Sequence, residues 1–123
     1  MLDTHLPHNH GQEIEHIANT LPSGEEFRTA AEVFKLLGDS TRMKIFWILC
    51  HCEECVINIS ALMDMSSPAV SHHLNRLKAA GLIVSRRDGK EVYYKAADSL
   101  LSTALHTMLE DMVEISCPGK TNL

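Results

Sequence analysis

Residues 49–55 have the sequence LCHCEEC, which places three thiols and one imidazole within seven residues. Thiolate and imidazole groups are the ligands with which proteins bind Zn²⁺ and softer thiophilic ions. In a continuous helix Cys50 and Cys52 would point almost in opposite directions, whereas Cys52 and Cys55 would share one face. A turn within the segment would allow all three thiols to converge on one ion.

A tetrahedral site built here needs a fourth ligand besides Cys50, Cys52 and Cys55. We expect His51 or a histidine of the N-terminal tail to supply it. The tail candidates are His5, His8, His10 and His16. Each group also has a simpler interpretation, since single cysteines are often small buried side chains and a His-rich tail can bind metal only loosely. Three cysteines so close together favour metal or thiol chemistry.

The composition indicates a single domain. With 123 residues, of which 45% are hydrophobic, the chain can bury one compact core. Its apolar runs fall far short of the ~18 residues of a membrane span, and the N-terminus lacks the basic and apolar regions of a secretory signal. We therefore expect a cytoplasmic protein with no membrane partner, in which the cysteines stay reduced instead of forming a disulfide framework.

Charge is unevenly distributed along the chain. The formal net charge is −5, yet residues 66–95 carry six lysines and arginines against two acidic residues. A local basic patch focuses the electrostatic field on one face, and phosphate groups respond to that field more than to net charge. The acidic composition therefore does not exclude a nucleic-acid partner.

Cap and turn residues predict a mainly helical fold. Ser23 caps the first helix, Asp39 or Ser40 caps the second, and Ser67 caps the fourth, with Pro68 in its first turn. The expected helices cover residues 25–37, 41–49, 58–65 and 69–80.

Strands replace helices after residue 81. The runs LIVSRR and KEVYYK are rich in β-branched and aromatic residues and are joined by Asp88 and Gly89, a strong signal for a β-hairpin. A last helix begins near Asp98 and ends before Pro118. We expect a flexible His-rich tail over residues 1–12, one domain over 13–118 and a C-terminal tail over 119–123.

The order of these elements predicts a winged helix-turn-helix. Val70, Leu74 and Leu77 share the inner side of the fourth helix, which leaves polar and basic side chains outside. Such side chains reach base edges and phosphates in a major groove, and a basic hairpin can lie along the DNA backbone. The residues expected to contact DNA are Ser66, Ser67, Ser71, His72, His73, Arg76, Arg86, Arg87 and Lys90. Either element alone would fit a solvated surface equally well, but together they favour double-stranded DNA as the partner.

Residues 30–114 resemble the ArsR/SmtB family of metal- and thiol-responsive bacterial repressors. The characteristic parts are LLGDSTRMKI and AVSHHLNRLKAAGL, the latter followed by the basic RRDGK. The resemblance implies a homodimer, joined through its first and last helices, that reads a palindromic operator. Apolar residues at intervals of four and three in the last helix fit either this interface or packing on the chain's own core. They are Leu101, Leu105, Met108, Met112 and Ile115.

The family resemblance also implies two places for a sensing site. The first is a Cys-x-Cys pair that precedes the recognition helix, which here would be the expected helix of residues 69–80. Cys55 matches the first position of this pair and Ile57 the second. In some members an N-terminal arm completes the site. The second lies on the last helix and requires two histidines that this chain lacks. Its matching positions are Asp98, Leu100, Asp111 and Glu114.

The sequence leaves two residues near the C-terminus open. His106 lies off the family's ligand positions and receives no role. Cys117 sits at the end of a helix, where the dipole disfavours a thiolate. It would become a further ligand or a disulfide partner if the fold brought it near Cys50 or Cys55.

These patterns predict a transcriptional repressor whose operator affinity falls when a metal ion or metalloid binds a cysteine cluster. The candidate ligands are Cys50, His51, Cys52, Cys55 and Cys117, and the candidate ions are Zn²⁺, Cd²⁺, Pb²⁺ and arsenite. The alternative is a repressor that senses oxidants or reactive sulfur with the same thiols. A dithiol oxidoreductase fits less well, because the CEEC motif of residues 52–55 lacks a βαβ setting and no other catalytic motif occurs. We therefore predict that the chain is not an enzyme.

Overall fold

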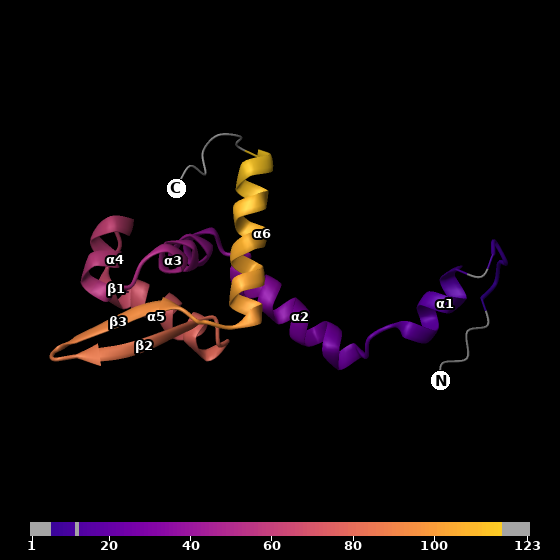
Figure 1. Ribbon diagram of the computed structural model, residues 1–123, viewed down its shortest axis with the longest axis horizontal. Coiled ribbons are helices and arrows are strands. Elements are labelled where there is room, and N and C mark those ends of the chain that lie inside the picture. The colour runs from indigo at the N-terminus through magenta and orange to yellow at the C-terminus, as the bar shows by residue number, and fades with distance from the viewer. Residues whose placement is uncertain (1–5, 12, 117–123) are drawn as a thin grey trace. The chain divides into compact units, whose positions relative to one another are not determined.

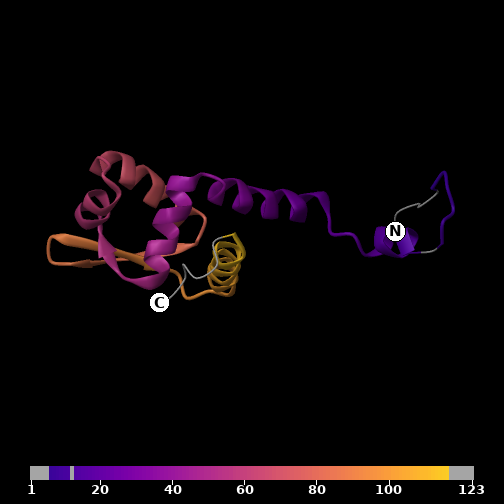
Figure 2. The same cartoon turned by 90° about the horizontal axis from the view of Figure 1, so that it is seen from above.

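The computed structural model describes residues 6–11 and 13–116 (Figures 1 and 2). It forms two units, Met1–Val33 and Phe34–Leu123. The elements in chain order are α1 (Glu13–Thr20), α2 (Gly24–Leu37), α3 (Ser40–His51), β1 (Glu54–Cys55), α4 (Val56–Met63), α5 (Ser67–Ala79), β2 (Ile83–Asp88), β3 (Glu91–Ala96) and α6 (Leu100–Ser116). The mainly helical fold class with a small β-hairpin is confirmed.

The first unit consists of α1 and most of α2. The amide of Glu26 donates to the hydroxyl of Ser23 over 3.1 Å, so Ser23 caps α2 as predicted. Helix α1 was not predicted from the sequence; it has no buried residues and no hydrogen-bonded cap among the described contacts. Without a cap signal or a buried stripe, an eight-residue helix leaves little trace in the sequence.

Side-chain caps fix the start of α3 and of α5, the second helix of the helix-turn-helix formed by α4 and α5. Asp39 accepts a 2.9 Å hydrogen bond from the amide of Arg42, which begins α3 at Ser40. The cap of α5 is Ser66, which accepts from the amide of Ala69 over 3.3 Å. The prediction of Ser67 as the cap was therefore wrong by one residue, because Ser67 already lies in the first turn of the helix.

The sheet has three antiparallel strands in the order β1-β3-β2. In the predicted hairpin Asp88 pairs with Glu91, so the two-residue turn is Gly89 and Lys90, one position later than expected. Gly89 has a φ of +64°, a conformation that glycine adopts without steric cost. Strand β1, in which Glu54 pairs with Tyr94, was not predicted from the sequence. This strand joins the LCHCEEC segment of residues 49–55, called the cysteine segment, to the β2–β3 hairpin, called the wing.

The core of the second unit lies among α3, α4, α5 and the start of β2. Its fully buried side chains include Ile45, Phe46, Ile59, Leu74, Leu77, Leu82 and Ile83. Arg42 is also buried, and its Nη1 donates to the carbonyl of Leu36 over 2.8 Å. In this unit α5 packs against α3, α4 and β2, and Figure 2 shows α4 and α5 beside the hairpin with α3 crossing it. This packing sets the orientation of α5.

The apolar stripe predicted on α6 divides between two environments. Leu105 is buried, as is Leu109, which packs on the same unit. Leu101 and Met112 remain 45% and 51% exposed. Packing on the chain's own core therefore accounts for only part of the stripe. No described helix is both long and apolar enough to cross a membrane.

Candidate functional site

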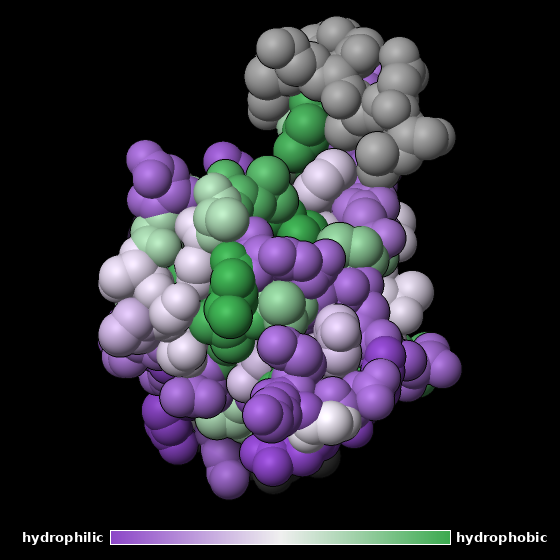
Figure 3. Space-filling model, turned by 90° about the vertical axis from the view of Figure 1, so that its left-hand side faces the viewer, coloured by the Kyte–Doolittle hydropathy of each residue, from purple (hydrophilic) through white to green (hydrophobic). Residues whose placement is uncertain are grey.

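The outer face of α5 carries exposed side chains that can hydrogen-bond to DNA. Val70, Leu74 and Leu77 are completely buried, as their spacing predicted. The opposite side of the helix carries His72, Asn75 and Arg76, which are all exposed. Figure 3 faces α4 and the hairpin tip and shows mainly hydrophilic residues around a smaller hydrophobic strip.

Three basic residues of this region are free of ion pairs within the described part of the chain. Arg76 lies on α5, Arg87 on β2 and Lys90 in the hairpin turn, and all three are exposed. A cation without a protein partner can neutralise a phosphate without first breaking an ion pair. These residues are therefore well suited to contact a polyanion.

Arg86 differs from these three residues because its guanidinium is already engaged. Its Nη2 lies 2.7 Å and its Nε 3.0 Å from Oε1 of Glu53, in a forked ion pair. Its Cζ also lies 4.9 Å from the ring centre of Tyr93. The hydrogen bonds from Arg86 lower the pKa of Glu53, and the same pair raises the pKa of Arg86. Glu53 belongs to the LCHCEEC segment, so this pair links that segment to the wing.

Other predicted DNA contacts have roles within the fold. Ser66 caps α5, and the hydroxyl of Ser67 lies 3.3 Å from that of Ser60 on α4. His73 is half-buried and its Nδ1 is shielded from solvent without a hydrogen-bond partner. Burial, followed by the charge of Arg42, lowers the pKa of His73. Ser71, also half-buried, lies one turn into α5.

The three described cysteines occupy different environments. Cys50, near the end of α3, is half-buried, and burial together with the negative charge of Glu110 raises its pKa to about 12. Cys52 is exposed, and its thiol donates to the carbonyl of Ile48 over 3.5 Å. Cys55 is buried in β1, opposite Tyr93. The helix thus ends before the second thiol, and the chain continues from Cys52 to Cys55 as extended backbone.

Within the described ranges, the one group of three or more potential metal ligands with converging atoms does not include a thiol. It consists of His51, His106 and Glu110. The three cysteines do not form such a group together, and the predicted cysteine site remains a prediction. Cys117 and His5 lie outside the described residues. His8 and His10 stack with ring centres 5.5 Å apart.

His51, the last residue of α3, faces α6. Its Nε2 lies 2.7 Å from Oε1 of Glu110 and 3.2 Å from Nε2 of His106. His106 Nε2 lies 2.8 Å from the same carboxylate oxygen. These hydrogen bonds, from His106 first, lower the pKa of Glu110. The sequence left His106 unassigned; only its i, i+4 spacing from Glu110 hinted at a shared face.

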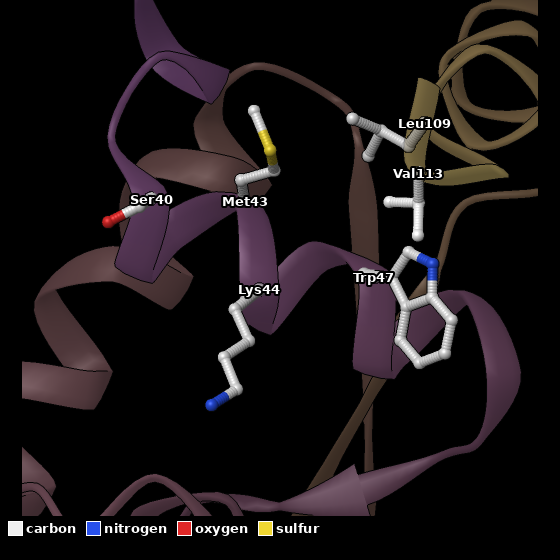
Figure 4. A pocket seen from close by; sticks show the side chains of 6 residues that line it. All are labelled: Ser40, Met43, Lys44, Trp47, Leu109 and Val113. Carbon is white, nitrogen blue, oxygen red and sulfur yellow. The ribbon is translucent and has the colours of Figure 1, made fainter. Parts of the chain in front are cut away.

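An apolar pocket of about 220 Å³ lies beside this cluster, between α3 and α6. Figure 4 shows the indole of Trp47 next to Val113, with Leu109 nearby. The Trp47 ring also contacts His51, with ring centres 4.2 Å apart. The carboxylates Asp98, Asp111 and Glu114 are exposed and join no group of three ligands in the part of the chain described.

Comparison with known proteins places the helix-turn-helix in one family. Residues 39–85 match the family model described as bacterial regulatory protein, arsR family. The cadmium resistance transcriptional regulatory protein CadC of Listeria innocua is 48% identical over 62 residues, which cover 50% of this chain and 52% of CadC. The chain therefore matches only about half the length of this relative. The transcriptional repressor SmtB homolog of Synechocystis is 33% identical over 90 residues, which cover 73% of this chain and 68% of the homolog.

The fold agrees with that of a solved winged helix-turn-helix. The homodimeric DNA-binding domain of Mb0332 from Mycobacterium bovis has a TM-score of 0.67 and 24% identity, and the match covers 83% of this chain and 96% of that one. The matching family model and the CadC relative are described as regulatory proteins, in agreement with the prediction that the chain is not an enzyme. The match to more than two thirds of the SmtB homolog, together with the family model, shows that the chain belongs to the ArsR/SmtB family of bacterial regulatory proteins.

Proposed function

We propose that the chain is a sequence-specific transcriptional repressor whose affinity for its operator falls when a thiophilic metal ion or metalloid binds the cysteine segment. The observation that carries the DNA part is the face formed by α5 and the hairpin. It presents exposed hydrogen-bonding groups on a helix next to the unpaired cations Arg76, Arg87 and Lys90. That face coincides with the one basic segment found in the sequence.

The residues of this face divide into two roles. Arg76, with His72 and Ser71, would reach base edges and set sequence preference. Arg87 and Lys90 would contact phosphates, which fix the register of the protein but do not read sequence. Arg86 would join them only when its ion pair with Glu53 opens. His73, Ser66 and Ser67 would contribute mainly by orienting α5.

A homodimer would place two such faces on a palindromic operator. The exposed apolar residues of α6, Leu101 and Met112, support this arrangement because large apolar side chains left in water favour association. The homodimeric Mb0332 domain has the same fold. We propose that α6 provides one part of the dimer interface.

Two contacts between the cysteine segment and the wing support the effector part of the proposal. Glu54 and Cys55 form β1, which pairs with β3 at Tyr94 and Tyr93. Glu53 holds Arg86 of β2. An ion that draws Cys52 and Cys55 together would strain the pairing of β1 with β3 and shift the hairpin relative to α5. This shift would outweigh any phosphate contact that Arg86 gains when its pair with Glu53 opens. A coupling of about 1–3 kcal/mol would weaken operator binding roughly 5–150-fold.

The chemistry of the ligand follows from the thiols. Cys52 and Cys55 are the first candidates because one is exposed and the two are three residues apart, and Cd²⁺, Zn²⁺, Pb²⁺ and arsenite all accept thiolate ligands. The CadC relative, named for cadmium resistance, supports a metal of this class. Cys50 would have to lose a proton that burial holds tightly. The exposure of Cys52 also supports a second candidate effector, an oxidant or reactive sulfur species that would bridge the thiols.

The proposal can be tested by fluorescence anisotropy with labelled DNA from upstream of the gene and with scrambled DNA of equal length. We expect tighter binding to the upstream DNA and release by one thiophilic ion in the wild type but not in Cys55→Ser. Reversal by a chelator would identify a metal, and reversal only by a reductant would identify a disulfide or polysulfide. Equal affinity for both DNAs would contradict the repressor role, and release of Cys55→Ser at wild-type concentrations would contradict the cysteine site.

A further inference from the structure

We propose that His51, His106 and Glu110 form a binding site for a divalent first-row transition metal ion, separate from the cysteines, that joins the end of α3 to the middle of α6. The site lies within the second unit and does not depend on the proposed response of DNA binding. In this site His51 of α3 acts together with two ligands of α6, whereas the sequence had suggested this histidine as a fourth ligand for the thiols.

The hydrogen-bonding groups of the cluster cannot all be satisfied by one another. The Nε2 atoms of His51 and His106 approach the same oxygen of Glu110 to 2.7 and 2.8 Å and lie 3.2 Å from each other. If both nitrogens carry a proton, both can donate to the carboxylate, but then neither can accept from the other. If one accepts from the other, it can no longer donate to Glu110. At least one of the three contacts is therefore always unfavourable.

A metal ion would resolve this conflict by accepting all three lone pairs. Zn²⁺ binds nitrogen and carboxylate oxygen at about 2.0–2.2 Å, which in a tetrahedral shell separates neighbouring ligand atoms by about 3.3 Å. The observed separations of 2.7, 2.8 and 3.2 Å reach this value with side-chain movements of a few tenths of an ångström. Water would occupy the remaining position, since the three side chains are 24–30% exposed.

Neighbouring residues hold the ligands in this arrangement. His106 and Glu110 are one turn apart on α6, so both project from one face of the helix. The ring of His51 packs against Trp47 at 4.2 Å and meets the ring of His106 edge-on, with an interplanar angle of 87°. Because these three side chains are already held near one another, they lose less conformational entropy when an ion binds.

The ligand types indicate which ions the site would take. Two imidazoles and one carboxylate suit Zn²⁺, Co²⁺ and Ni²⁺, whereas Cd²⁺ and Pb²⁺ prefer the thiolates of the cysteine segment. Cys50 is the nearest thiol in sequence and lines a cleft of about 230 Å³ with His106. Among the described residues its thiol is not one of the atoms that converge on this site, so the expected ligands are the two imidazoles and the carboxylate.

The single tryptophan of the chain makes the site directly observable. Because the Trp47 ring lies 4.2 Å from the ring of His51, an ion bound at His51 should change its fluorescence. The experiment titrates full-length protein in which all four cysteines are replaced by serine, first with Zn²⁺ and then with Co²⁺. We expect saturation of the Trp47 signal at one ion per chain and a visible Co²⁺ spectrum without thiolate charge-transfer bands.

Substitution then identifies the ligands. His106→Asn and Glu110→Gln should each weaken Zn²⁺ binding roughly 10-fold or more. The matched control is Asp111→Asn, which removes a carboxylate from the exposed neighbouring position of α6 and should leave the affinity unchanged. Circular dichroism establishes that each variant is folded. The proposal is overturned if the cysteine-free protein binds no Zn²⁺, or if folded His106→Asn and Glu110→Gln bind it as tightly as Asp111→Asn does.

Discussion

The surface of α5 and the hairpin that we propose binds DNA, called the DNA face, differs from the contact between α3 and α6 in how its polar groups are satisfied. On the DNA face Arg76, Arg87 and Lys90 project into solvent without ion-pair partners in the described chain. At the α3–α6 contact His51, His106 and Glu110 already hold one another. Free cations suit a large polyanion, whereas ligands that are already close together suit a small cation.

The LCHCEEC segment lies between these two regions and touches both. His51 and Cys50 belong to the α3–α6 contact, while Glu53 and Cys55 contact strands of the wing. A change in this segment can therefore reach the DNA face through the ion pair of Arg86 and the pairing of β1. The position of the thiols in the fold, more than their number, supports a regulatory role.

The largest expected contrast is the reactivity of two neighbouring thiols. With a pKa of about 12, Cys50 has about one thiolate in ten thousand molecules at pH 8, whereas Cys52 is exposed to the reagent. We expect iodoacetamide to modify Cys52 far faster than Cys50 in the native protein. The rate at Cys50 should rise with pH up to about pH 12, because only deprotonation makes this thiol nucleophilic. Peptide mass spectrometry measures both rates, and similar rates at pH 8 would show that the α3–α6 contact is open to solvent.

Arg76→Ala should produce the largest loss among single changes on the DNA face. An arginine that reads a base contributes about 1–3 kcal/mol to the specific site and much less to random DNA. Anisotropy titrations with operator and scrambled DNA measure the two losses. An equal loss on both would move Arg76 from base reading to phosphate contact.

Arg87→Ala should weaken binding to every DNA sequence by a smaller, uniform factor. Removing one phosphate contact lowers the slope of log affinity against log salt concentration by about 0.9. Titrations at several salt concentrations give the slope. Lys44→Ala, on α3 outside the proposed interface, serves as the control and should keep the wild-type slope. A slope unchanged by Arg87→Ala would remove this residue from the interface.

Glu53→Gln should have the smallest effect, and its direction is opposite to that of the preceding changes. It removes the carboxylate that holds Arg86, so the freed guanidinium can reach phosphate and DNA binding should become slightly tighter. The control is Glu91→Gln, which deletes an exposed wing carboxylate that does not pair with Arg86. A gain of the same size in both variants would show that net charge, not release of Arg86, is responsible.

Local signals in the sequence predicted most of the fold. Asp39 and Pro68 marked the helix starts, and the spacing of Val70, Leu74 and Leu77 gave the buried side of α5, because caps and periodicity depend on residues close in sequence. The missed features depend on distant partners. The two-residue strand β1 exists only because it pairs with β3.

The same distinction applies to the candidate sites. The exposure of the basic residues on α5 and the hairpin could be predicted because it follows from helix periodicity and from a hairpin turn. The engagement of Arg86 by Glu53 depends on residues 33 positions apart, and that of His51 by Glu110 on residues 59 apart. No local pattern in one sequence encodes these contacts. They changed the interpretation of His51, His106 and Arg86.

The central claim is that the cysteine segment and the DNA face are energetically coupled, and one measurement tests it. The affinity for Cd²⁺ is determined by competition with a chromophoric chelator, for the free protein and for the protein saturated with operator DNA. Linkage requires DNA to weaken Cd²⁺ binding by the same factor by which Cd²⁺ weakens DNA binding, so we predict roughly 5–150-fold weaker binding in the complex, with no such difference in Cys55→Ser. Equal Cd²⁺ affinities for the free and DNA-bound wild type would contradict the account.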